Sequence, residues 1–335
     1  MSPPLAPAML EAIERELQKV LDHLDPQREP EMVRMLRHHF GWAESRGESG
    51  GKRVRSLLTL LTCAAAGGDW APALPAAAAV ELIHNFSLLH DDIEDRSEFR
   101  RGRPTVWVEW GVPQAINTGD ALFALSHLAT YPMLESGVSP TTCLDVRRIL
   151  DDACLELTRG QHLDIAFESR ETVSLEEYQR MIEGKTGALL AAATHAGAAL
   201  GGADGPRRQA YRSFGLHLGL AFQVQDDFLG IWGEPERTGK APGDDLRTRK
   251  KSFPIAVGLS DSPEFRQRWS GQDRDEAAVR AMIRLLEQTG ARSRTEAAAE
   301  THTRHALEAL AQAQPQSPAA EELESLSSHL LRRTA

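Results

Sequence analysis

Two clusters of aspartates, about 135 residues apart, are the side chains of this sequence best suited to chemistry. The first is Asp91-Asp92-Ile93-Glu94-Asp95 and the second is Asp226-Asp227, and each follows an apolar run. Burying an unpaired carboxylate is costly, so a positive partner is expected at each. Hard cations such as Mg²⁺ bind carboxylate oxygens and keep water or substrate phosphates as further ligands. The clusters therefore predict a site where two helices bind a phosphorylated substrate through metal ions.

The spacing of the first cluster suits metal binding. On a helix, Asp91 and Asp95 lie on one face with Asp92 beside them. Like charges one turn apart repel, and near the end of a helix the macrodipole adds to this penalty, whereas a bound cation would reverse both. The alternative is a solvated acidic helix end, which this motif by itself does not exclude.

Basic residues follow or precede both clusters. Arg100, Arg101 and Arg103 come just after Asp95, and Lys52, Arg53 and Arg55 precede an apolar run; Lys185 and the segment from Lys240 to Lys251 accompany the second cluster. Lysine and arginine suit phosphate, which arginine binds through two parallel hydrogen bonds. Ordinary basic surface loops are the alternative. Two diphosphates and several Mg²⁺ ions would satisfy all of these groups.

The elements that position these residues are predicted to be helices. Apolar spacing and composition indicate helices over 7–24, 54–66, 74–90, 114–136, 142–168, 174–200, 206–231, 274–290 and 293–312. Breaks between them carry glycine and proline, as at Ser139-Pro140 and residues 201–206. No credible run of alternating strands is present. We predict one all-α domain over residues 1–335, with more helices than a four-helix bundle.

Composition narrows the class of protein. A chain of 335 residues that is 41% hydrophobic and 26% charged can form a large core. Its net charge of −10 argues against general nucleic-acid binding. No apolar run of membrane-spanning length and no signal peptide are recognised, so we predict no stable membrane insertion and a cytoplasmic location. The three cysteines have neither a disulfide nor a zinc spacing.

The motifs closely resemble those of the trans-polyprenyl diphosphate synthases. The resemblance spans about residues 50–255, in the order and spacing of that family. Its blocks are Gly51-Lys52-Arg53-x-Arg55, Glu81 to Asp95, Arg100-Arg101-Gly102-x-Pro104-Thr105, Gly119-Asp120, Gly160-Gln161-x-x-Asp164, Lys185-Thr186, Phe222-Gln223-x-x-Asp226-Asp227, Thr238-Gly239-Lys240, Asp245-Leu246 and Lys250.

The resemblance implies a large helical bundle of the isoprenoid synthase type around a deep central cavity, normally in a homodimer. It implies a short-chain prenyltransferase that condenses isopentenyl diphosphate with dimethylallyl, geranyl or farnesyl diphosphate. It also implies three Mg²⁺ ions per active site. Asp91, Asp92 and Asp95 would bind Mg²⁺ on one side of the allylic diphosphate, and Asp226 and Asp227 on the other.

The remaining site residues are also assigned by the resemblance. Those for isopentenyl diphosphate are Lys52, Arg55, His84 and Arg101. Those for the allylic diphosphate are Arg100, Lys185 and Lys240. The catalytic candidates are Lys185, Thr186 and Gln223, of which Thr186 and Gln223 would face the developing carbocation. Gln161 and Asp164 are secondary candidates near the metal site. In this chemistry the allylic C–O bond ionises, so no side-chain nucleophile is required.

One position departs from the family. The second motif usually ends in a third aspartate, and Gly230 stands there. We expect Asp226 to provide most of the metal binding on that side and Gly230→Asp to change activity only modestly.

Product length is predicted from the residues four and five before Asp91, which are Ser87 and Phe86. They lie just over one helical turn, roughly 6–8 Å, from the metal ligands. A single aromatic at Phe86 resembles the geranylgeranyl (C20) synthases. Farnesyl (C15) and C25 synthases remain alternatives, and Phe86 as an ordinary core residue is a further one.

Three other functions remain open. A terpene cyclase would not need Lys52, Arg55 and Arg101. A non-catalytic partner subunit of a heteromeric synthase usually loses metal ligands, whereas one position is altered here. A metal-dependent phosphohydrolase lacks support from a histidine-rich metal set, because most of the twelve histidines are scattered.

Overall fold

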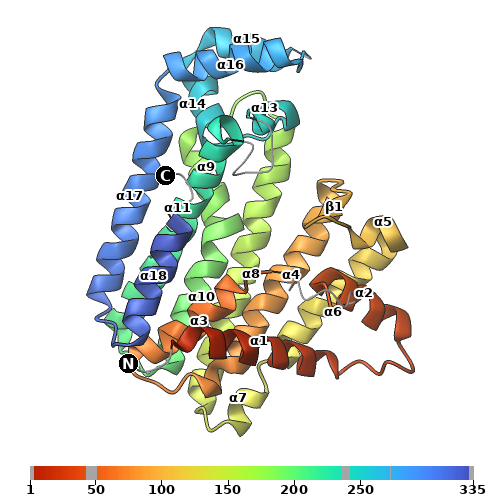
Figure 1. Cartoon of the computed structure of the whole chain (residues 1–335), viewed down its shortest axis with the longest axis vertical. Coiled ribbons are helices and arrows are strands. Elements are labelled where there is room, and N and C mark those ends of the chain that lie inside the picture. Colours follow the sequence, from red (N-terminus) through yellow and green to blue (C-terminus); the bar gives the residue numbers. More distant parts are fainter. Residues whose placement is uncertain (1–3, 43–50, 235–241, 272, 332–335) are drawn as a thin grey trace. The chain divides into compact units, whose positions relative to one another are not determined.

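The computed structural model describes residues 4–42, 51–234, 242–271 and 273–331, which form two compact units (Figure 1). Unit 1 comprises residues 1–151, 193–208 and 315–323. Unit 2 comprises residues 152–192, 209–314 and 324–335. Each unit is described by itself. The prediction of one domain over the whole chain stays a prediction.

Unit 1 contains the N-terminal elements. They are α1 (Leu5–Leu21), α2 (Pro30–Phe40), α3 (Val54–Ala66), η1 (Ala71–Ala73), α4 (Leu74–Glu94), β1 (Phe99–Arg100), β2 (Arg103–Pro104), α5 (Val106–Trp110), α6 (Val112–Leu128) and α7 (Pro132–Glu135). Four further helices contribute residues to both units: α8 (Pro140–Glu168), α10 (Ala188–Leu200), α11 (Gly205–Trp232) and α18 (Ala319–Leu331).

Unit 2 contains the other elements. They are α9 (Leu175–Ile182), η2, a turn of π-helix (Glu183–Gly187), α13 (Asp244–Thr248), α14 (Phe253–Asp261), α15 (Pro263–Ser270), α16 (Glu276–Gln288) and α17 (Ala291–Gln312).

Helix α4 is the central helix of unit 1 and packs against α1, α3 and α6. Its first half is apolar all round, and residues 75–83 are buried without exception. A helix with this composition is stable only inside a core. Polar side chains begin at Glu81, so burial in the first half fixes where the carboxylates at the other end emerge.

A short hairpin follows α4 (Figure 1). Its strands β1 and β2 are antiparallel, with Phe99 opposite Pro104 and Arg100 opposite Arg103. The two turn residues, Arg101 and Gly102, have φ of 53° and 74°. Positive φ at both central residues is the type I′ geometry, which matches the twist of two antiparallel strands.

The predicted all-α fold is confirmed, and this hairpin is the one sheet among the described residues. Two-residue strands are too short to produce an alternating pattern, which explains why the sequence showed none. The helix predicted over 174–200 is divided by the π-helical turn. No described helix is long and apolar enough to cross a membrane.

Candidate active site

Unit 1 brings the first aspartate cluster to the end of α4. Asp92 is buried, Asp91 is half-buried, and Asp95 is exposed at the C-cap, where its backbone N–H bonds to the carbonyl of Asp91. Burial raises the pKa of Asp92. Its Oδ2 atom is buried and has no hydrogen-bond partner among the described residues. Such an oxygen requires either a proton or a cation.

Arg100 of the hairpin contacts this cluster. Its Nε atom donates to Oδ1 of Asp92 (2.8 Å), and its Nη2 atom lies 3.4 Å from Oδ2 of Asp91. The type I′ turn therefore folds the Arg100 guanidinium back over the end of α4. The side chain predicted to bind an allylic diphosphate lies beside the predicted metal ligands.

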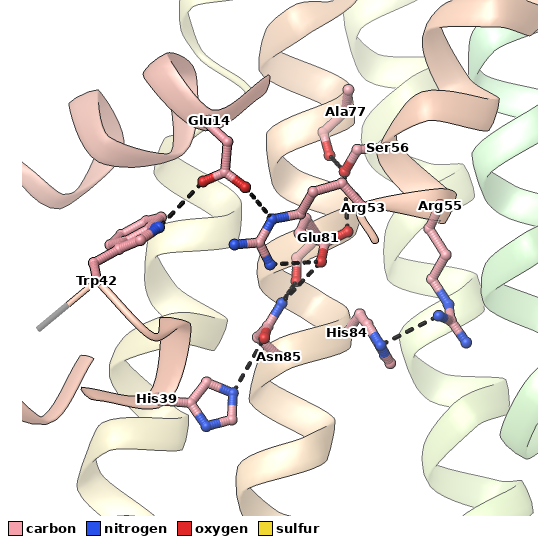
Figure 2. A network of polar contacts seen from close by, with 10 residues as sticks. All are labelled: Glu14, His39, Trp42, Arg53, Arg55, Ser56, Ala77, Glu81, His84 and Asn85. Atoms are coloured by element: carbon pink, nitrogen blue, oxygen red, sulfur yellow. Dashed lines mark hydrogen bonds and ion pairs between the residues drawn. The ribbon is translucent and has the colours of Figure 1, made fainter. Parts of the chain in front are cut away.

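A second group of cations lies along α4, before the aspartates. The guanidinium of Arg55, at the start of α3, donates from Nη1 to Nε2 of His84 (3.2 Å), as Figure 2 shows. Because His84 accepts this bond, its Nε2 atom carries no proton. Burial lowers the pKa of His84 well below its usual value, and Arg55 and Arg101 lower it further.

Arg101 faces the loop that precedes α3. Its guanidinium lies about 3.0 Å from the point where a side chain on Gly51 would begin, which places it against the segment containing the exposed Lys52. Burial and the neighbouring charges of Arg53 and Arg100 lower the pKa of Arg101. Arg55 is half-buried and Arg101 is exposed. Cations that lie close together repel one another, and this repulsion is relieved when an anion binds between them. This part of unit 1 has the electrostatics of a site for a polyanion.

Arg53 and Glu81 form a buried ion pair beside Arg55 and His84 (Figure 2). Arg53 donates to Glu14 (2.6 Å) and to Glu81 (3.2 Å), and both Arg53 and Glu81 are buried. Although burial opposes its charge, the two carboxylates raise the pKa of Arg53. The amide of Asn85 bonds to Glu81 (3.2 Å) and to the ring of His39 (3.1 Å). These bonds link α1, α2 and α4 to the loop before α3.

The arginines of the hairpin also line a small hollow in unit 1. Its walls are His38, His39, Asp92, Arg100, Arg101, Arg103, Pro104, Thr105 and Val106. A carboxylate, three guanidiniums and two imidazoles thus face one recess.

In unit 2 the second aspartate pair divides into two different environments. Asp226 is exposed, whereas Asp227 is buried. Oδ2 of Asp227 accepts hydrogen bonds from the hydroxyl of Tyr178 and from the backbone N–H of Phe253. Its Oδ1 atom accepts from Nε2 of Gln223 (3.0 Å).

Lys250 lies 3.6 Å from Oδ1 of Asp227. Although burial opposes its charge, Asp227 and its neighbouring carboxylates raise the pKa of Lys250. Because donors already occupy both oxygens of Asp227, this carboxylate holds α9, α11 and α14 together in unit 2. Asp226 is the one of the pair that presents its carboxylate to solvent.

Lys185 and Thr186 stand on the π-helical turn η2. A π-turn widens a helix by one residue and commonly occurs at functional sites. Here Lys185 donates to Asp164 (2.6 Å), and the hydroxyl of Thr186 donates to Oε1 of Gln223 (2.8 Å). A hydrogen-bonded chain therefore runs from Thr186 through Gln223 to Asp227. The structure brings these predicted residues together within unit 2.

Close contact between two helices makes this arrangement possible. A Cβ atom on Gly160 of α8 would lie 2.0 Å from the backbone nitrogen of Lys185. Any residue with a side chain would push η2 away from α8. Glycine at position 160 therefore sets the reach of Lys185 toward Asp164.

Gly230 has a neighbour that the sequence did not indicate. A Cβ atom on Gly230 would lie 2.5 Å from the carboxyl carbon of Asp245, which is buried and belongs to α13. Burial raises the pKa of Asp245 to about 6. The Asp245 carboxylate thus occupies the space of a side chain at position 230. An aspartate at position 230 would have to displace this buried carboxylate. The contact weighs against the expectation that Gly230→Asp changes activity only modestly, which stays a prediction.

The other predicted residues are placed as follows. Phe86 and Ser87 are half-buried on α4; the ring of Phe86 lies 5.3 Å from that of Phe123 on α6, and the hydroxyl of Ser87 bonds to the carbonyl of His84 (2.7 Å). Gln161 is half-buried on α8. Lys240 lies outside the described residues.

Sequence reasoning assigned no role to Glu81, Tyr178 or Asp245. Glu81 was detectable in principle, because a carboxylate inside an apolar helix needs a cationic partner and Arg53 precedes another apolar helix. No sequence pattern connects Tyr178 with Asp227, or Asp245 with Gly230, because each pair meets only through the fold.

Residues 42–286 match the polyprenyl synthetase family. The chain belongs to this family. The predictions of the trans-polyprenyl diphosphate synthase family and of a prenyltransferase are thereby confirmed. The match includes both aspartate clusters and every residue assigned above.

Three relatives refine the comparison. The chain is 40% identical over 338 residues to (2E,6E)-farnesyl diphosphate synthase of Mycobacterium tuberculosis, covering 97% of this chain and 91% of the relative. It is 42% identical over 267 residues to geranylgeranyl diphosphate synthase of the same organism, covering 78% and 74%. The crystal structure of geranylgeranyl pyrophosphate synthase from Corynebacterium glutamicum, complexed with isoprenyl diphosphate and magnesium, matches with a TM-score of 0.81 at 27% identity and covers 98% of both chains. These relatives make this chain a short-chain prenyltransferase but differ in product length.

Proposed function

We propose that this prenyltransferase condenses isopentenyl diphosphate with an allylic diphosphate and releases geranylgeranyl diphosphate (C20). The observation that carries the proposal is the charge arrangement of unit 1. Burial lowers the pKa of Arg55, and burial together with the charges of Arg53 and Arg100 lowers that of Arg101, so an anion would be favoured beside them. Further along α4, the buried Oδ2 atom of Asp92 has no hydrogen-bond partner among the described residues, so a cation would be favoured there. A diphosphate bound through metal ions satisfies both requirements.

The residues present fit magnesium. The buried, unpartnered Oδ2 atom of Asp92 and the exposed carboxylates of Asp95 and Asp226 are oxygen ligands of the kind that Mg²⁺ takes. We assign three ions to Asp91, Asp92, Asp95, Asp226 and Asp227, with Asp226 as the direct ligand in unit 2. When bound, Mg²⁺ neutralises charge on the leaving diphosphate and so favours ionisation of the allylic C–O bond.

The protein side chains carry out the other tasks. We assign Lys52, Arg55, His84 and Arg101 to the diphosphate of isopentenyl diphosphate, where the guanidiniums of Arg55 and Arg101 can donate to phosphate oxygens. Arg100, Lys185 and Lys240 are assigned to the allylic diphosphate. In each of the contacts above, Arg100 and Lys185 are now held by aspartates, so we infer that these bonds exchange when substrate binds.

Thr186 and Gln223 are assigned to the carbocation. Their side chains are fixed by a mutual hydrogen bond and by Asp227. Fixed dipoles stabilise developing positive charge without reorganising during the reaction. The proton lost at the end of the condensation passes to a base outside these side chains, for which the departing diphosphate is suited.

Phe86 supports the assignment of chain length. Its ring, backed by Phe123, lies on the face of α4 that also carries His90, just over one turn before Asp91. We propose that it limits growth of the product at C20. The relative that makes farnesyl diphosphate keeps C15 as the second candidate.

The experiment is an incubation of the purified chain with Mg²⁺, labelled isopentenyl diphosphate and, in turn, dimethylallyl, geranyl and farnesyl diphosphate. A C20 alcohol after dephosphorylation is expected. A C15 product would leave the enzyme class unchanged and refute the proposal that Phe86 limits the product at C20. Cyclised hydrocarbon without use of isopentenyl diphosphate would indicate a terpene cyclase, and no incorporation would favour a partner subunit.

Phe86→Ala tests directly whether the ring of Phe86 limits the length of the product. We expect products longer than C20, because removing the ring opens space beyond the growing chain, whereas Ser87→Phe is expected to shorten the product to C15. Tyr131→Ala is the matched control, since it removes an aromatic ring that is 66% exposed. If Phe86→Ala and Tyr131→Ala make products of the same size, Phe86 does not limit the length of the product.

We also propose that the chain is a homodimer. Val112, Ile116 and Phe123 on α6 are 38–42% exposed and lie on one helical face. An exposed apolar face of this kind marks an interaction surface. Light scattering on the eluting protein should give about twice the mass of 36.8 kDa, and the monomer mass would contradict the proposal.

A further inference from the structure

Three histidines in unit 2 come together outside the site described above. His217 lies on α11, and His302 and His305 lie on α17 (Figure 1 shows both helices). The three side chains each offer one ring nitrogen within 4.8 Å of the other two. None of them belongs to a motif that the proposed function uses.

The contacts among these rings are close. Nδ1 of His217 lies 3.1 Å from Nδ1 of His302, and the two rings are stacked at 26°. The ring of His305 meets that of His217 edge-on, with centroids 5.0 Å apart. His302 and His305 are three residues apart, so their helix presents both rings on one side.

These distances are those of ligands around a tetrahedral ion. Zinc binds imidazole nitrogen at about 2.0–2.1 Å, so two nitrogens of one tetrahedral zinc lie about 3.3–3.4 Å apart. The separation of 3.1 Å between His217 and His302 approaches this value without a change of backbone. A shift of the His305 side chain alone would complete a set of three.

The ring nitrogens are available as ligands. At a separation of 3.1 Å, two imidazoles share one proton at most, since two imidazolium N–H groups would repel. Burial and the other two histidines lower the pKa of His302 to about 4, so its ring is neutral at neutral pH. A metal ion requires neutral imidazole.

The donor set selects the class of ion. Imidazole suits zinc, copper, nickel and cobalt, whereas magnesium prefers carboxylate and water oxygens. The site therefore differs in chemistry from the aspartate clusters. An ion held by three protein ligands keeps a position open to water.

We propose that His217, His302 and His305 form a site for one transition-metal ion, with zinc as the first candidate, that ties α11 to α17. His217 precedes Gln223 by six residues, or about 9 Å along α11. A bound ion would therefore fix the helix that carries Gln223, Asp226 and Asp227. The site links the placement of that helix to the supply of a trace metal.

The test uses the full chain without a histidine tag, in excess Mg²⁺ so that the carboxylates are occupied. Co²⁺ is titrated while its visible absorption is recorded, because tetrahedral nitrogen ligation gives strong bands that carboxylate and water ligation do not. One equivalent with a dissociation constant of about 1 μM or below is expected. Zn²⁺ should displace Co²⁺, and at a hundredfold excess over its dissociation constant it should raise the unfolding midpoint by about 4 °C.

Variants decide whether the histidines are the ligands. His217→Gln and His302→Gln are each expected to weaken Co²⁺ binding by at least tenfold, and His305→Gln to reduce its visible bands. His329→Gln, on the exposed side of α18, is the matched control and should bind as the unchanged chain does. Circular dichroism without metal establishes that each variant folds.

Two outcomes would overturn the proposal. One is the absence of saturable Co²⁺ binding under these conditions, and the other is binding that survives both His217→Gln and His302→Gln. If His217→Gln does not fold, His305→Gln together with His302→Gln provides the same decision. Prenyltransferase activity is not a readout here, so failure of this site and failure of the proposed function remain distinguishable.

Discussion

The two Asp-Asp pairs of this chain have the same sequence and different surroundings. In both, the second aspartate is buried: Asp92 in unit 1 and Asp227 in unit 2. Asp92 accepts a hydrogen bond from an arginine of a two-stranded hairpin, and its other oxygen has no hydrogen-bond partner within the described part of the chain. Asp227 has donors on both oxygens, two of them uncharged side chains and one a backbone amide.

We propose that this difference separates a metal ligand, Asp92, from a structural support, Asp227. A carboxylate with an open oxygen and an exchangeable cation is ready for metal and diphosphate, whereas a carboxylate with filled oxygens fixes the helices around it. Aspartate pairs that look equivalent in a motif therefore have unequal tasks. The predictions below test this difference, beginning with the largest expected effect.

Asp226→Asn and Asp227→Asn should separate the two tasks in unit 2. We expect Asp226→Asn to lower kcat by about 10²–10³-fold with little change in the unfolding midpoint, as for loss of one strong electrostatic contact in a transition state. Asp227→Asn leaves buried donors facing an amide, which costs about 1–3 kcal/mol of stability. Steady-state kinetics and thermal unfolding measure the two effects. Equal losses of stability in both variants would abolish the distinction.

Arg55→Met should weaken binding of isopentenyl diphosphate. A hydrogen bond to a charged group contributes about 1.5–3 kcal/mol, so its KM should rise by at least about tenfold, while the KM of the allylic substrate stays unchanged. Arg55→Lys keeps the charge but not the paired donors, so its KM for isopentenyl diphosphate should lie between those of the unchanged chain and of Arg55→Met. If the KM of the allylic substrate rises instead, the assignment of Arg55 to isopentenyl diphosphate is wrong.

Gly230→Ala should destabilise unit 2. Its new methyl would meet the Asp245 carboxylate, and overpacking of this kind costs about 1–3 kcal/mol. Because the two residues would be in contact, Asp245→Ser should recover part of the loss in the double variant. Denaturant unfolding of the four proteins gives the coupling, and purely additive losses would show that the methyl finds other space.

Glu177→Gln should have the smallest effect and a defined pH dependence. Hydrogen bonds from Arg170 and from the backbone of Ser174 lower the pKa of Glu177 to about 2. Its contribution to stability is therefore present above about pH 4.5 and is lost as the pH falls toward 2. The midpoints of the unchanged chain and of Glu177→Gln should differ at pH 7 and converge as the pH falls to about 2. A constant difference across this range would contradict the role of the charge.

Part of this structure was predictable from local pattern. The helix over residues 54–66 begins and ends where expected, because its apolar run is bounded by Arg53 and Gly67. The helix from residue 74 was expected to end at residue 90 and continues to Glu94, because the acidic residues that interrupt its apolar pattern still extend its backbone. Short helices such as α13 and α15 lack the length for a visible periodicity.

The site could be predicted only as far as residue types and motif order carry information. Both aspartate clusters, and His84, Arg55, Thr186 and Gln223, are identifiable from the sequence, whereas their contacts are not. The filled coordination of Asp227 depends on Tyr178 and Lys250, which are 49 and 23 residues away in sequence and meet it through tertiary packing. The π-turn at Lys185 and the carboxylate beside Gly230 likewise follow from how helices approach each other.

The turn of the hairpin has a consequence for directed evolution. Arg101 adopts a left-handed backbone with φ of 53°, which costs a residue with a side chain about 1–2 kcal/mol relative to glycine. Arg101→Gly would relieve that strain. A library screened for thermal tolerance alone would thus enrich glycine at this position, and each selected clone would lack a guanidinium of the proposed diphosphate site. Selection for heat resistance is expected to favour glycine at position 101, whereas selection for turnover is expected to retain arginine.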